Sequence, residues 1–514
     1  MGTAHEGGSR MTHGDTMGSH GGEGAQTARE AQDPRRWLAL VAIAAAQFMV
    51  VLDIAIVNVA LPSIARDLHF SQASLQWVIS AYAIAFGGFL LLGGRLADLW
   101  GRRRMFMVGV TLFSLSSLMC GLSWSAGSLI TFRVLQGLGG AILSPAALSI
   151  LMTTFAEGRE RNVALGVWGA VAGSGAAAGT LLGGVLTSAL SWSWIFFVNV
   201  PVGAIVVATA PLLLRESRVE GERGSDFAGA VTVTAGLMLL VYAMTEAATH
   251  GWGNARTVGF LAGSAVLLAA FIVIELRNRT PIMPFRIFRL KTLRGANLVG
   301  LLVGAALFSQ FFLLTLYMQD VLHYSALKTG VAYLTSTLTI IAFSGIGQAL
   351  VTRYGVKPIL TTGLILAGVA IGIFYTRLPV DGTYPGDLLL PFILTGIGLG
   401  LTFVPFSIAG LTGVQPEDAG LASGLINTSP QIGGAIGLAI ASTIATTVTS
   451  HFLASHQGEN PLQGVVNGFH AAFVAQAAFT ILGAVVALLM IERRDAGRPA
   501  VAPAMDAEKA QSQI

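Results

Sequence analysis

Residues 37–59 read WLALVAIAAAQFMVVLDIAIVNV, and Asp53 is the only charged residue in this stretch. A helix that crosses the hydrocarbon core of a bilayer needs about 20 predominantly apolar residues. Membrane β-strands alternate in polarity over about ten residues, which this continuous apolar run does not do. The stretch therefore predicts a transmembrane helix.

Further stretches of the same kind follow along the chain. They lie near residues 74–95, 105–123, 127–151, 163–187, 194–214, 227–247, 257–276, 295–318, 329–351, 358–376, 388–410, 422–447 and 468–491. Together with 37–59 they predict an all-α membrane protein with 14 transmembrane helices.

The composition agrees with a membrane protein. Of the 514 residues, 54% are hydrophobic and 11% are charged, whereas soluble domains carry roughly 25% charged residues. The basic residues are scattered over short hydrophilic gaps rather than gathered into one stripe, which argues against a nucleic-acid partner. A single cysteine, Cys120, allows neither an intrachain disulfide nor a cysteine metal cluster. We expect no metal site and no cofactor.

Lysine and arginine residues predict the orientation, because cytoplasmic loops of membrane proteins carry an excess of them. With the N-terminus in the cytoplasm, the inward-facing segments hold 22 such residues and the outward-facing loops hold four. The four outer residues are Arg66, Arg256, Lys328 and Arg377. Both termini are therefore expected in the cytoplasm. The preference for arginine over lysine is typical of a GC-rich bacterial genome, so the membrane is expected to be the bacterial inner, or plasma, membrane.

Two long inner loops, 215–226 and 277–294, bracket the seventh and eighth spans and divide the chain. We predict a six-helix bundle over 35–215, an insertion of two helices and cytoplasmic loops over 216–294, and a second six-helix bundle over 295–494. Residues 1–34 and 495–514 are expected to be disordered cytoplasmic tails. A faint repeat, GRLADLWGRRR at 94–104 and TRYGVK at 352–357, predicts pseudo-symmetric bundles, as in secondary transporters.

Three ionisable residues within the predicted spans are the main functional candidates: Asp53, Arg133 and Glu246. Such residues are costly in a membrane and mark functional sites. At 1.5 Å per residue, Asp53 and Arg133 lie at a similar depth, roughly 10 Å from the outer ends of their spans. Burial favours a protonated carboxyl, and a nearby arginine or bound cation favours the charged form. Asp53 is therefore a predicted proton carrier. A fixed structural ion pair is the alternative, and an interfacial position is the alternative for Glu246.

The fifth span contains glycines at four-residue spacing. Gly169 and Gly173 form one such pair, and Gly175, Gly179 and Gly183 form a longer series that Gly184 follows. Glycines four residues apart share one helix face and allow another backbone to approach closely. The face predicts either simple helix packing or a sliding surface for conformational change, and the two roles are compatible.

Several segments resemble a known family, in the family's order. They are VLDIAIVNVALP (51–62), GRLADLWGRRR (94–104), RVLQGLGGA (133–141), the glycine run of span five, WSWIFFVNVPVG (192–203), LYMQDVLHYSALKTG (316–330) and GLASGLINTSPQIGGAIG (420–437). They resemble the fourteen-span drug:proton antiporters of the major facilitator superfamily. The resemblance covers roughly residues 36–494.

The resemblance implies roles for individual residues. Asp53, Arg133 and Gln136 would act in proton coupling or substrate recognition, with Glu246 as a further candidate. A cytoplasmic latch would include Gly94, Asp98, Gly101 and Arg102. The glycine run would be the antiporter motif, and Asn58, Gln310, Asn427 and Gln431 are further cavity candidates. This chain departs from the family at Ala55, Leu99, Ala176, Thr180 and Pro430, where threonine, arginine, two prolines and arginine are usual.

The resulting expectation is a secondary transporter that exports drugs or other amphipathic small molecules, hydrophobic or cationic, in exchange for protons. It would act by alternating access, as a monomer, and draw on the proton motive force. A proton-coupled symporter, or an exporter of one secreted metabolite, is the alternative, because fold does not fix function. A primary pump would need a phosphate-binding loop with a lysine after glycine. None of the lysines Lys291, Lys328, Lys357 and Lys509 follows a glycine. Intramembrane enzyme motifs are also lacking.

Overall fold

The computed structural model describes residues 35–155, 159–217, 227–278, 285–414, 419–456 and 458–492, together with Gly2, Pro281 and Met283. Within these ranges the chain forms helices joined by turns and short connections, and no strand occurs among the described residues. The all-α prediction is therefore confirmed for the described part of the chain.

The helices of the first half are α2 (Arg35–Asp67), α3 (Gln72–Leu75), α4 (Trp77–Trp100), α5 (Arg102–Gly121), α6 (Ala126–Thr154), α7 (Arg159–Ala189), α8 (Trp194–Phe197) and α9 (Asn199–Leu213). Next come α10 (Phe227–His250) and α11 (Ala255–Arg277). The second half holds η1 (Phe285–Arg289), α12 (Lys291–Leu316), η2 (Tyr317–Val321), α13 (Ala326–Tyr354), α14 (Val356–Arg377), η3 (Tyr384–Leu388), α15 (Leu389–Leu411), α16 (Ala419–Ser455) and α17 (Pro461–Met490).

Every predicted stretch overlaps one of the long helices. In the described part of the chain, 11 helices are long and apolar enough to cross a membrane. The helices α4, α7 and α10 contribute shorter apolar runs, at Trp77–Leu90, Ala177–Ala189 and Ala228–Met244. A multi-span helical membrane protein is thus confirmed, and the number of 14 spans stays a prediction.

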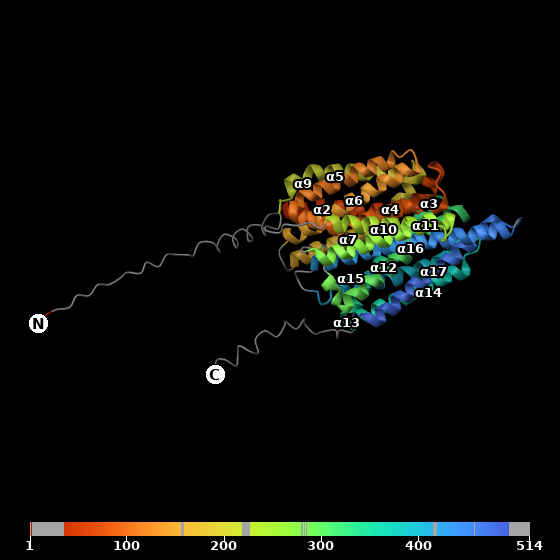
Figure 1. The fold of residues 1–514 in the computed structure, drawn as a ribbon. Coiled ribbons are helices and arrows are strands. Elements are labelled where there is room, and N and C mark those ends of the chain that lie inside the picture. The colour runs from red at the N-terminus through yellow and green to blue at the C-terminus, as the bar shows by residue number, and fades with distance from the viewer. Residues whose placement is uncertain are drawn as a thin grey trace, which may run out of the picture.

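The long helices lie side by side in one bundle, with α2, α4, α5, α6 and α9 on one side and α12, α13, α14, α15 and α17 on the other (Figure 1). In the first half α2 packs on α7, α4 and α5 pack on α6, and α5 packs on α9. In the second half α12 packs on α16, α13 and α14 pack on α15, and α14 packs on α17. The two sides meet where α7 packs on α13 and α4 packs on α16.

Two glycines form matching corners in the two halves. Gly101 is the only residue between α4 and α5, and its φ is 106°. Gly355 likewise separates α13 from α14, with a φ of 83°. Glycine adopts positive φ without the strain that a Cβ would cause. The faint repeat therefore marks two corners of the same kind.

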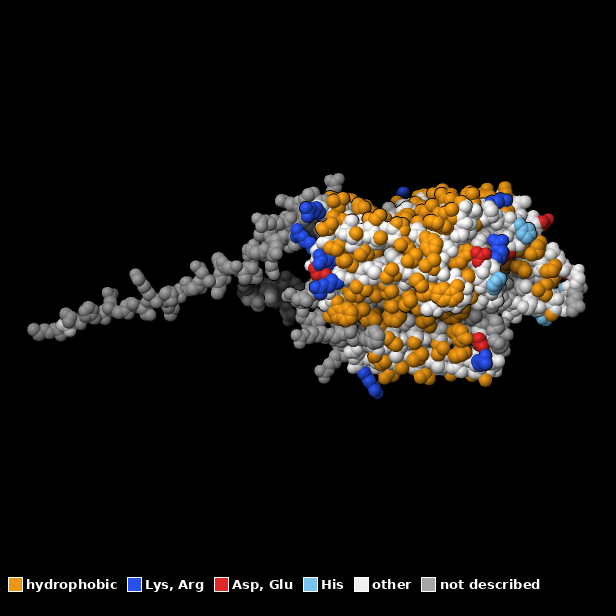
Figure 2. All heavy atoms as spheres, turned by 90° about the horizontal axis from the view of Figure 1, so that it is seen from above, with side chains coloured by type: hydrophobic (Ala, Val, Ile, Leu, Met, Phe, Trp, Pro, Cys, Tyr) orange, Lys and Arg blue, Asp and Glu red, His pale blue; other side chains and the backbone are white. Residues whose placement is uncertain are grey.

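Many of the basic residues lie at one end of the molecule. Figure 2 shows lysine and arginine side chains at the end where α2 begins and further ones at the opposite end, with apolar side chains along the flanks. At this end Arg36 Nη2 donates to Glu160 Oε1 at 2.7 Å and joins the starts of α2 and α7. Arg103 Nη1 donates to the Leu214 carbonyl at 3.3 Å and joins the start of α5 to the end of α9. Segments predicted to face the cytoplasm therefore lie together.

Candidate proton-coupling site

The structure brings Asp53 of α2 and Arg133 of α6 into direct contact. Arg133 Nη1 donates to Asp53 Oδ2 at 2.5 Å. Asp53 is 0% exposed and Arg133 1% exposed. Removing two charges from water costs several kcal/mol per ion unless they pair and form further hydrogen bonds. The surroundings of this pair supply such bonds.

Two amides complete the shell of the Asp53 carboxylate. Gln136 Nε2 donates to Asp53 Oδ1 at 2.8 Å, and Asn199 Nδ2 donates to the same oxygen at 3.0 Å. Gln136 lies three residues after Arg133, on the same face of α6, and was a predicted site residue. Asn199, at the start of α9, was missed. Its signal in the sequence was a polar amide inside the otherwise apolar segment WSWIFFVNVPVG.

The Arg133 guanidinium has further partners on α4 and α6. Its Nε donates to the Val78 carbonyl at 2.9 Å, and its Nη1 also donates to Gln136 Oε1 at 2.8 Å. The Tyr82 ring lies 4.3 Å from the guanidinium carbon, in cation–π geometry. The guanidinium of Arg133 thus contacts the Val78 carbonyl, the Gln136 amide oxygen and the Tyr82 ring at the same time, which the single ammonium group of a lysine could not do.

Side chains of α5 contact both amides. Asn199 Nδ2 donates to Ser117 Oγ at 3.0 Å, and Ser117 Oγ donates to the Phe196 carbonyl at 2.9 Å. Cys120 Sγ lies 3.6 Å from Gln136 Oε1. Five helices, α2, α4, α5, α6 and α9, therefore contribute to the hydrogen-bond network around one buried carboxylate. A proton or cation that neutralised Asp53 would weaken its bond to Arg133, so the network can couple one binding event to another.

Part of the glycine run packs directly beside Asp53. A Cβ at Gly179 would lie 2.7 Å from Ala55 Cβ and 2.8 Å from the Leu52 carbonyl oxygen of α2. Gly175 and Gly183 also face α2, next to Val51 and Ile56. Gly184 faces α13 instead, where a Cβ would lie 2.7 Å from the Ala326 carbonyl oxygen. Helix α7 therefore lies between α2 and α13.

The remaining predicted glycines, Gly169 and Gly173, lie in α7, and their surroundings are outside the described residues. The spacing of four residues predicted a shared face correctly for Gly175, Gly179 and Gly183, because helical residues four apart stack along one side.

Replacing Gly179 with alanine is expected to destabilise the protein by about 1–3 kcal/mol, because the new methyl group would overpack the α2–α7 contact. Gly259 on α11 is the matched control, since no atom lies within 4 Å of a Cβ built there. Thermal unfolding of the two purified variants in detergent provides the comparison. Equal stability of Gly179→Ala and Gly259→Ala would show that α7 and α2 do not need this close approach.

Of the predicted latch residues, Gly101 and Arg102 lie at the corner between α4 and α5, and Gly94 lies about two turns earlier on α4. A Cβ at Gly94 would lie 3.5 Å from the Pro145 side chain of α6, and the Arg102 backbone N–H donates to the Ser217 carbonyl at 2.9 Å. The side chain of Asp98 lies outside the described residues. A residue that the sequence did not indicate, Glu216, binds here: its carboxylate accepts from the backbone N–H groups of Arg103 at 3.1 Å and Arg104 at 3.2 Å.

The other site candidates lie apart from the Asp53 network. Glu246 is half-buried on α10 and is not among the hydrogen-bonding partners of Asp53. Asn58 Nδ2 donates to the Ile54 carbonyl of its own helix at 2.8 Å. Gln310 is buried on α12, and Asn427 is exposed on α16. Gln431 faces Gly87 of α4, where the two sides of the bundle meet.

The fold and the buried charge network define a multi-pass membrane transporter of the major facilitator superfamily. The model of that family matches residues 43–438, and the chain belongs to it. It is a membrane transporter and not an enzyme.

Two curated relatives illustrate its similarities. The puromycin resistance protein of Streptomyces alboniger is 41% identical over 482 residues, which cover 92% of this chain and 95% of that protein. The cephamycin export protein of Amycolatopsis lactamdurans is 42% identical over 472 residues, which cover 90% of this chain and 94% of that protein.

Solved structures share the fold. The POT family transporter PepTSo has a TM-score of 0.65 at 16% identity, and the match covers 89% of this chain and 98% of that one. A bacterial homologue of the human lysosomal transporter Spinster has a TM-score of 0.64 at 18% identity, over 89% of this chain and 97% of that one.

Proposed function

We propose that this protein exports drug-like small molecules, such as antibiotics, in exchange for protons. The observation that carries the proposal is the buried Asp53, which is held by a cation and two neutral amides within one half of the bundle. The kind of cargo follows from relatives that are named for puromycin resistance and cephamycin export. No cofactor takes part in this scheme, because the proton motive force supplies the energy.

Asp53 is the proposed proton carrier, and Arg133 regulates its charge. In the state described, Arg133 neutralises the carboxylate. A proton that reaches Asp53 would remove the attraction between them and release the guanidinium toward Gln136 and Tyr82. Loss of that proton on the other side of the membrane would restore the pair. A cationic or amphipathic substrate would compete with the proton for the same charge.

Contacts between the two sides of the bundle support alternating access. Gln319 Nε2, in η2, donates to the Val59 carbonyl of α2 at 2.7 Å, and this bond is buried. Ser188 Oγ of α7 accepts from the Leu327 backbone N–H of α13 at 3.0 Å. Both bonds lie at the end opposite the basic one, which we propose to be the outer face. An outward-open state would have to break them.

We further propose fourteen spans in two pseudo-symmetric six-helix bundles with α10 and α11 inserted, in the cell membrane, with cytoplasmic termini and a monomeric unit. The pairing of helices supports this arrangement: α2 with α7 corresponds to α12 with α16, and α4 with α6 corresponds to α13 with α15. The domain boundaries remain 35–215, 216–294 and 295–494. In this scheme Asp98 and the Gly101 corner form the cytoplasmic latch.

Everted membrane vesicles offer a direct test of the proposed function. An imposed gradient, acidic inside, should drive accumulation of puromycin or ethidium, and collapsing that gradient should abolish it. Added ATP should have no effect. Vesicles without the protein are the control. Accumulation that continues after the gradient is collapsed would exclude proton antiport, and movement in the same direction as the protons would favour the symport alternative.

The proposed topology makes its own prediction. Cys120 is buried and is the chain's one cysteine, so single cysteines can be placed in a Cys120→Ala background. Cysteines at Gly253 and Asp381 should react with a membrane-impermeant maleimide added to intact cells. A cysteine at Asn278, in the predicted inner loop, should react only after permeabilisation. Labelling of Asn278→Cys from outside would refute the fourteen-span topology.

A further inference from the structure

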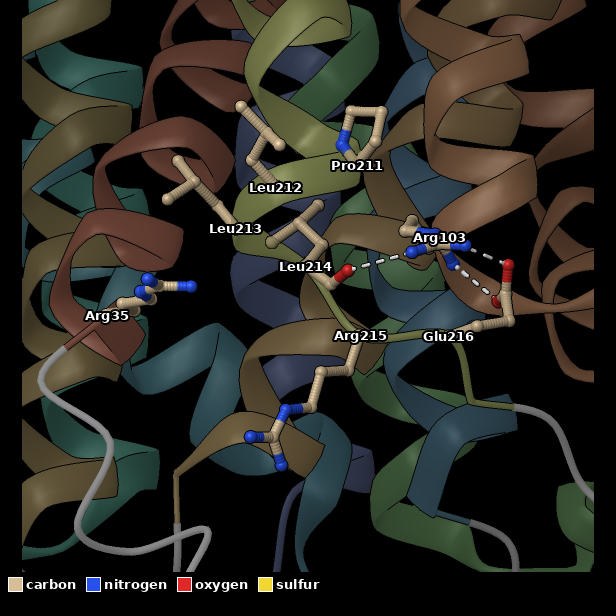
Figure 3. A pocket seen from close by; sticks show the side chains of 8 residues that line it. All are labelled: Arg35, Arg103, Pro211, Leu212, Leu213, Leu214, Arg215 and Glu216. Carbon is tan, nitrogen blue, oxygen red and sulfur yellow. Dashed lines mark hydrogen bonds and ion pairs between the residues drawn. The ribbon is translucent and has the colours of Figure 1, made fainter.

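A small cavity lies inside the second half of the bundle, between α12, α13 and α15. Six of the side chains that line it are Gln310, Phe311, Tyr333, Ser336, Phe392 and Thr395. Its volume is about 10 Å³, which is enough for one water molecule. It is distinct from the larger cavity of about 310 Å³ at the basic end, where Glu216 lies beside Arg103 (Figure 3). Gln310 was a predicted cavity residue, and the structure places it here.

One polar group in the small cavity lacks a hydrogen bond. Thr395 is 2% exposed, and its Oγ1 has no hydrogen-bonding partner within the described part of the chain. A buried hydroxyl without a partner is costly, and native proteins retain few of them. A ligand with a polar group that entered the cavity would satisfy this hydroxyl.

Three of the lining side chains are aromatic and lie together. The centroid of the Tyr333 ring is 4.9 Å from that of Phe311 and 5.6 Å from that of Phe392. The Tyr333 hydroxyl donates to the Phe311 carbonyl at 2.8 Å and lies 2.9 Å from Thr315 Oγ1, so its ring is held in place. Aromatic rings attract further rings through offset or edge-to-face contacts. Because the lining side chains are all uncharged, the cavity suits an uncharged aromatic group.

Helices α6 and α15 make the same close contact in the two halves. A Cβ at Gly139 of α6 would lie 2.5 Å from the backbone nitrogen of Phe113 on α5. A Cβ at Gly398 of α15 would lie 2.6 Å from the backbone nitrogen of Ala367 on α14. Gly398 therefore corresponds to Gly139, and this pair relates the residues of α15 to those of α6.

This correspondence relates the cavity to the charged network of the first half. Arg133 and Phe392 each lie six residues before the matched glycine, and Gln136 and Thr395 each lie three residues before it. The second half thus has a phenyl ring and a hydroxyl where the first half has a guanidinium and an amide. The site at this position in the second half is polar but carries no charge.

Helix α2, which carries Asp53, packs against two of the three helices that line the cavity, α12 and α13. Leu52 of α2 belongs to the same apolar cluster as Tyr333 and Phe392. Separation of the two halves would draw α2 away from α12 and α13 and widen the cavity beyond its present volume. The cavity would then admit a group larger than water at one stage of the transport cycle.

We propose that this cavity is a cargo subsite, which receives an uncharged aromatic ring of the exported molecule while Thr395 or Gln310 forms a hydrogen bond to a polar substituent on that ring. The subsite presupposes the export function proposed above and adds the class of cargo, a compound with a substituted aromatic ring. Proton handling at Asp53 and ring binding at Phe392 are then separate tasks of the two halves.

Equilibrium binding of radiolabelled puromycin to the purified full-length protein in detergent tests this subsite without requiring transport. Phe392→Leu should weaken binding roughly twofold to tenfold, because an aromatic contact is lost. Thr395→Val should weaken it by a similar factor through loss of the hydroxyl, yet unfold at no lower temperature than the wild type. The matched controls are Phe406→Leu and Thr402→Val, the same substitutions at buried positions of α15 outside the cavity, and both should keep wild-type affinity.

Wild-type affinity in both Phe392→Leu and Thr395→Val would overturn the subsite, and so would an equal loss in the controls or a wild type that binds no puromycin. If Phe392→Leu does not fold, Thr395→Val, which nearly keeps the shape of the side chain, decides the matter alone. Tetraphenylphosphonium should displace puromycin better than tetrabutylammonium, which has the same charge but no rings. Equal effects of the two ions would contradict recognition of an aromatic ring.

The subsite and the proposed function can fail separately in these measurements. Weakened binding by the two cavity variants, in a protein whose transport ignores the proton gradient, would uphold the subsite and exclude proton antiport. Gradient-driven transport with wild-type puromycin affinity in both variants would uphold the function and overturn the subsite.

Discussion

Replacing Asp53 with asparagine is expected to abolish proton release on substrate addition and to abolish uphill efflux. Asparagine keeps the shape of the side chain but carries no exchangeable charge. Its amide group would also face donors, because Gln136, Asn199 and Arg133 all donate to the Asp53 carboxylate. The measurement is proton release from purified protein in weakly buffered detergent as substrate is added, followed across pH.

The matched control for this change is Asp67→Asn. Asp67 lies on the same helix and accepts a hydrogen bond from Trp192 Nε1 at 2.7 Å, so the control makes the same substitution outside the buried network. Proton release should persist in it. The variant Asp53→Glu keeps a titratable group and should retain slower, coupled transport. If Asp53→Asn releases protons on the wild-type profile, the carrier lies elsewhere, and Glu246 becomes the next candidate.

The second large effect is expected from Arg133→Gln, which should destabilise the protein by about 3–5 kcal/mol, because it leaves a buried carboxylate without its cation. The double variant Asp53→Asn/Arg133→Gln should be more stable than Arg133→Gln alone, since it removes both charges. Arg133→Lys should recover part of the stability, because the charge returns but the bonds to Val78 and Gln136 do not. Unfolding in detergent with all variants at equal concentration measures these differences.

Arg66→Gln provides the control for the loss of an arginine. The hydrogen bonds that Arg66 forms with described residues go to Pro62 and Ser63 of its own helix, each at 3.3 Å, and its replacement should change stability by no more than about 0.5 kcal/mol. If the double variant lost the sum of the two single effects, Asp53 and Arg133 would be energetically independent, and the coupling role of the pair would have to be abandoned.

The central pair was predictable from the sequence because helix geometry is regular. A constant rise per residue placed Asp53 and Arg133 at the same depth, whereas Gln136 was named only because of the family resemblance. Asn199 was not predictable in the same way. Its contact with Asp53 depends on the break between α8 and α9 and on how α9 packs against α2, and neither follows from periodicity.

Contacts made by residues in loops were also not predictable from the sequence. Glu216 lies in a hydrophilic segment where the positive-inside rule gives little weight to acids, yet its carboxylate caps α5. Pro430, noted only as a departure from the family, packs so closely on Gly304 of α12 that a Cβ there would overlap its backbone. The four-residue spacing predicted which glycines share a helix face. The helices that pack against that face are known only from the structure.

The distribution of buried charge has a consequence for the evolution of this transporter. Within 285–414, 419–456 and 458–492, the buried polar side chains are uncharged hydroxyls and amides such as Gln310, Ser442 and Gln476, whereas Asp53 and Arg133 lie in the first half. Neutral side chains can be exchanged for one another at small energetic cost, but one member of an ion pair cannot be lost without the other. Under the proposed function, mutations in the second half would therefore alter which compound is carried while the proposed proton-handling pair stays intact, so a change of cargo would not require rebuilding the energy-coupling step.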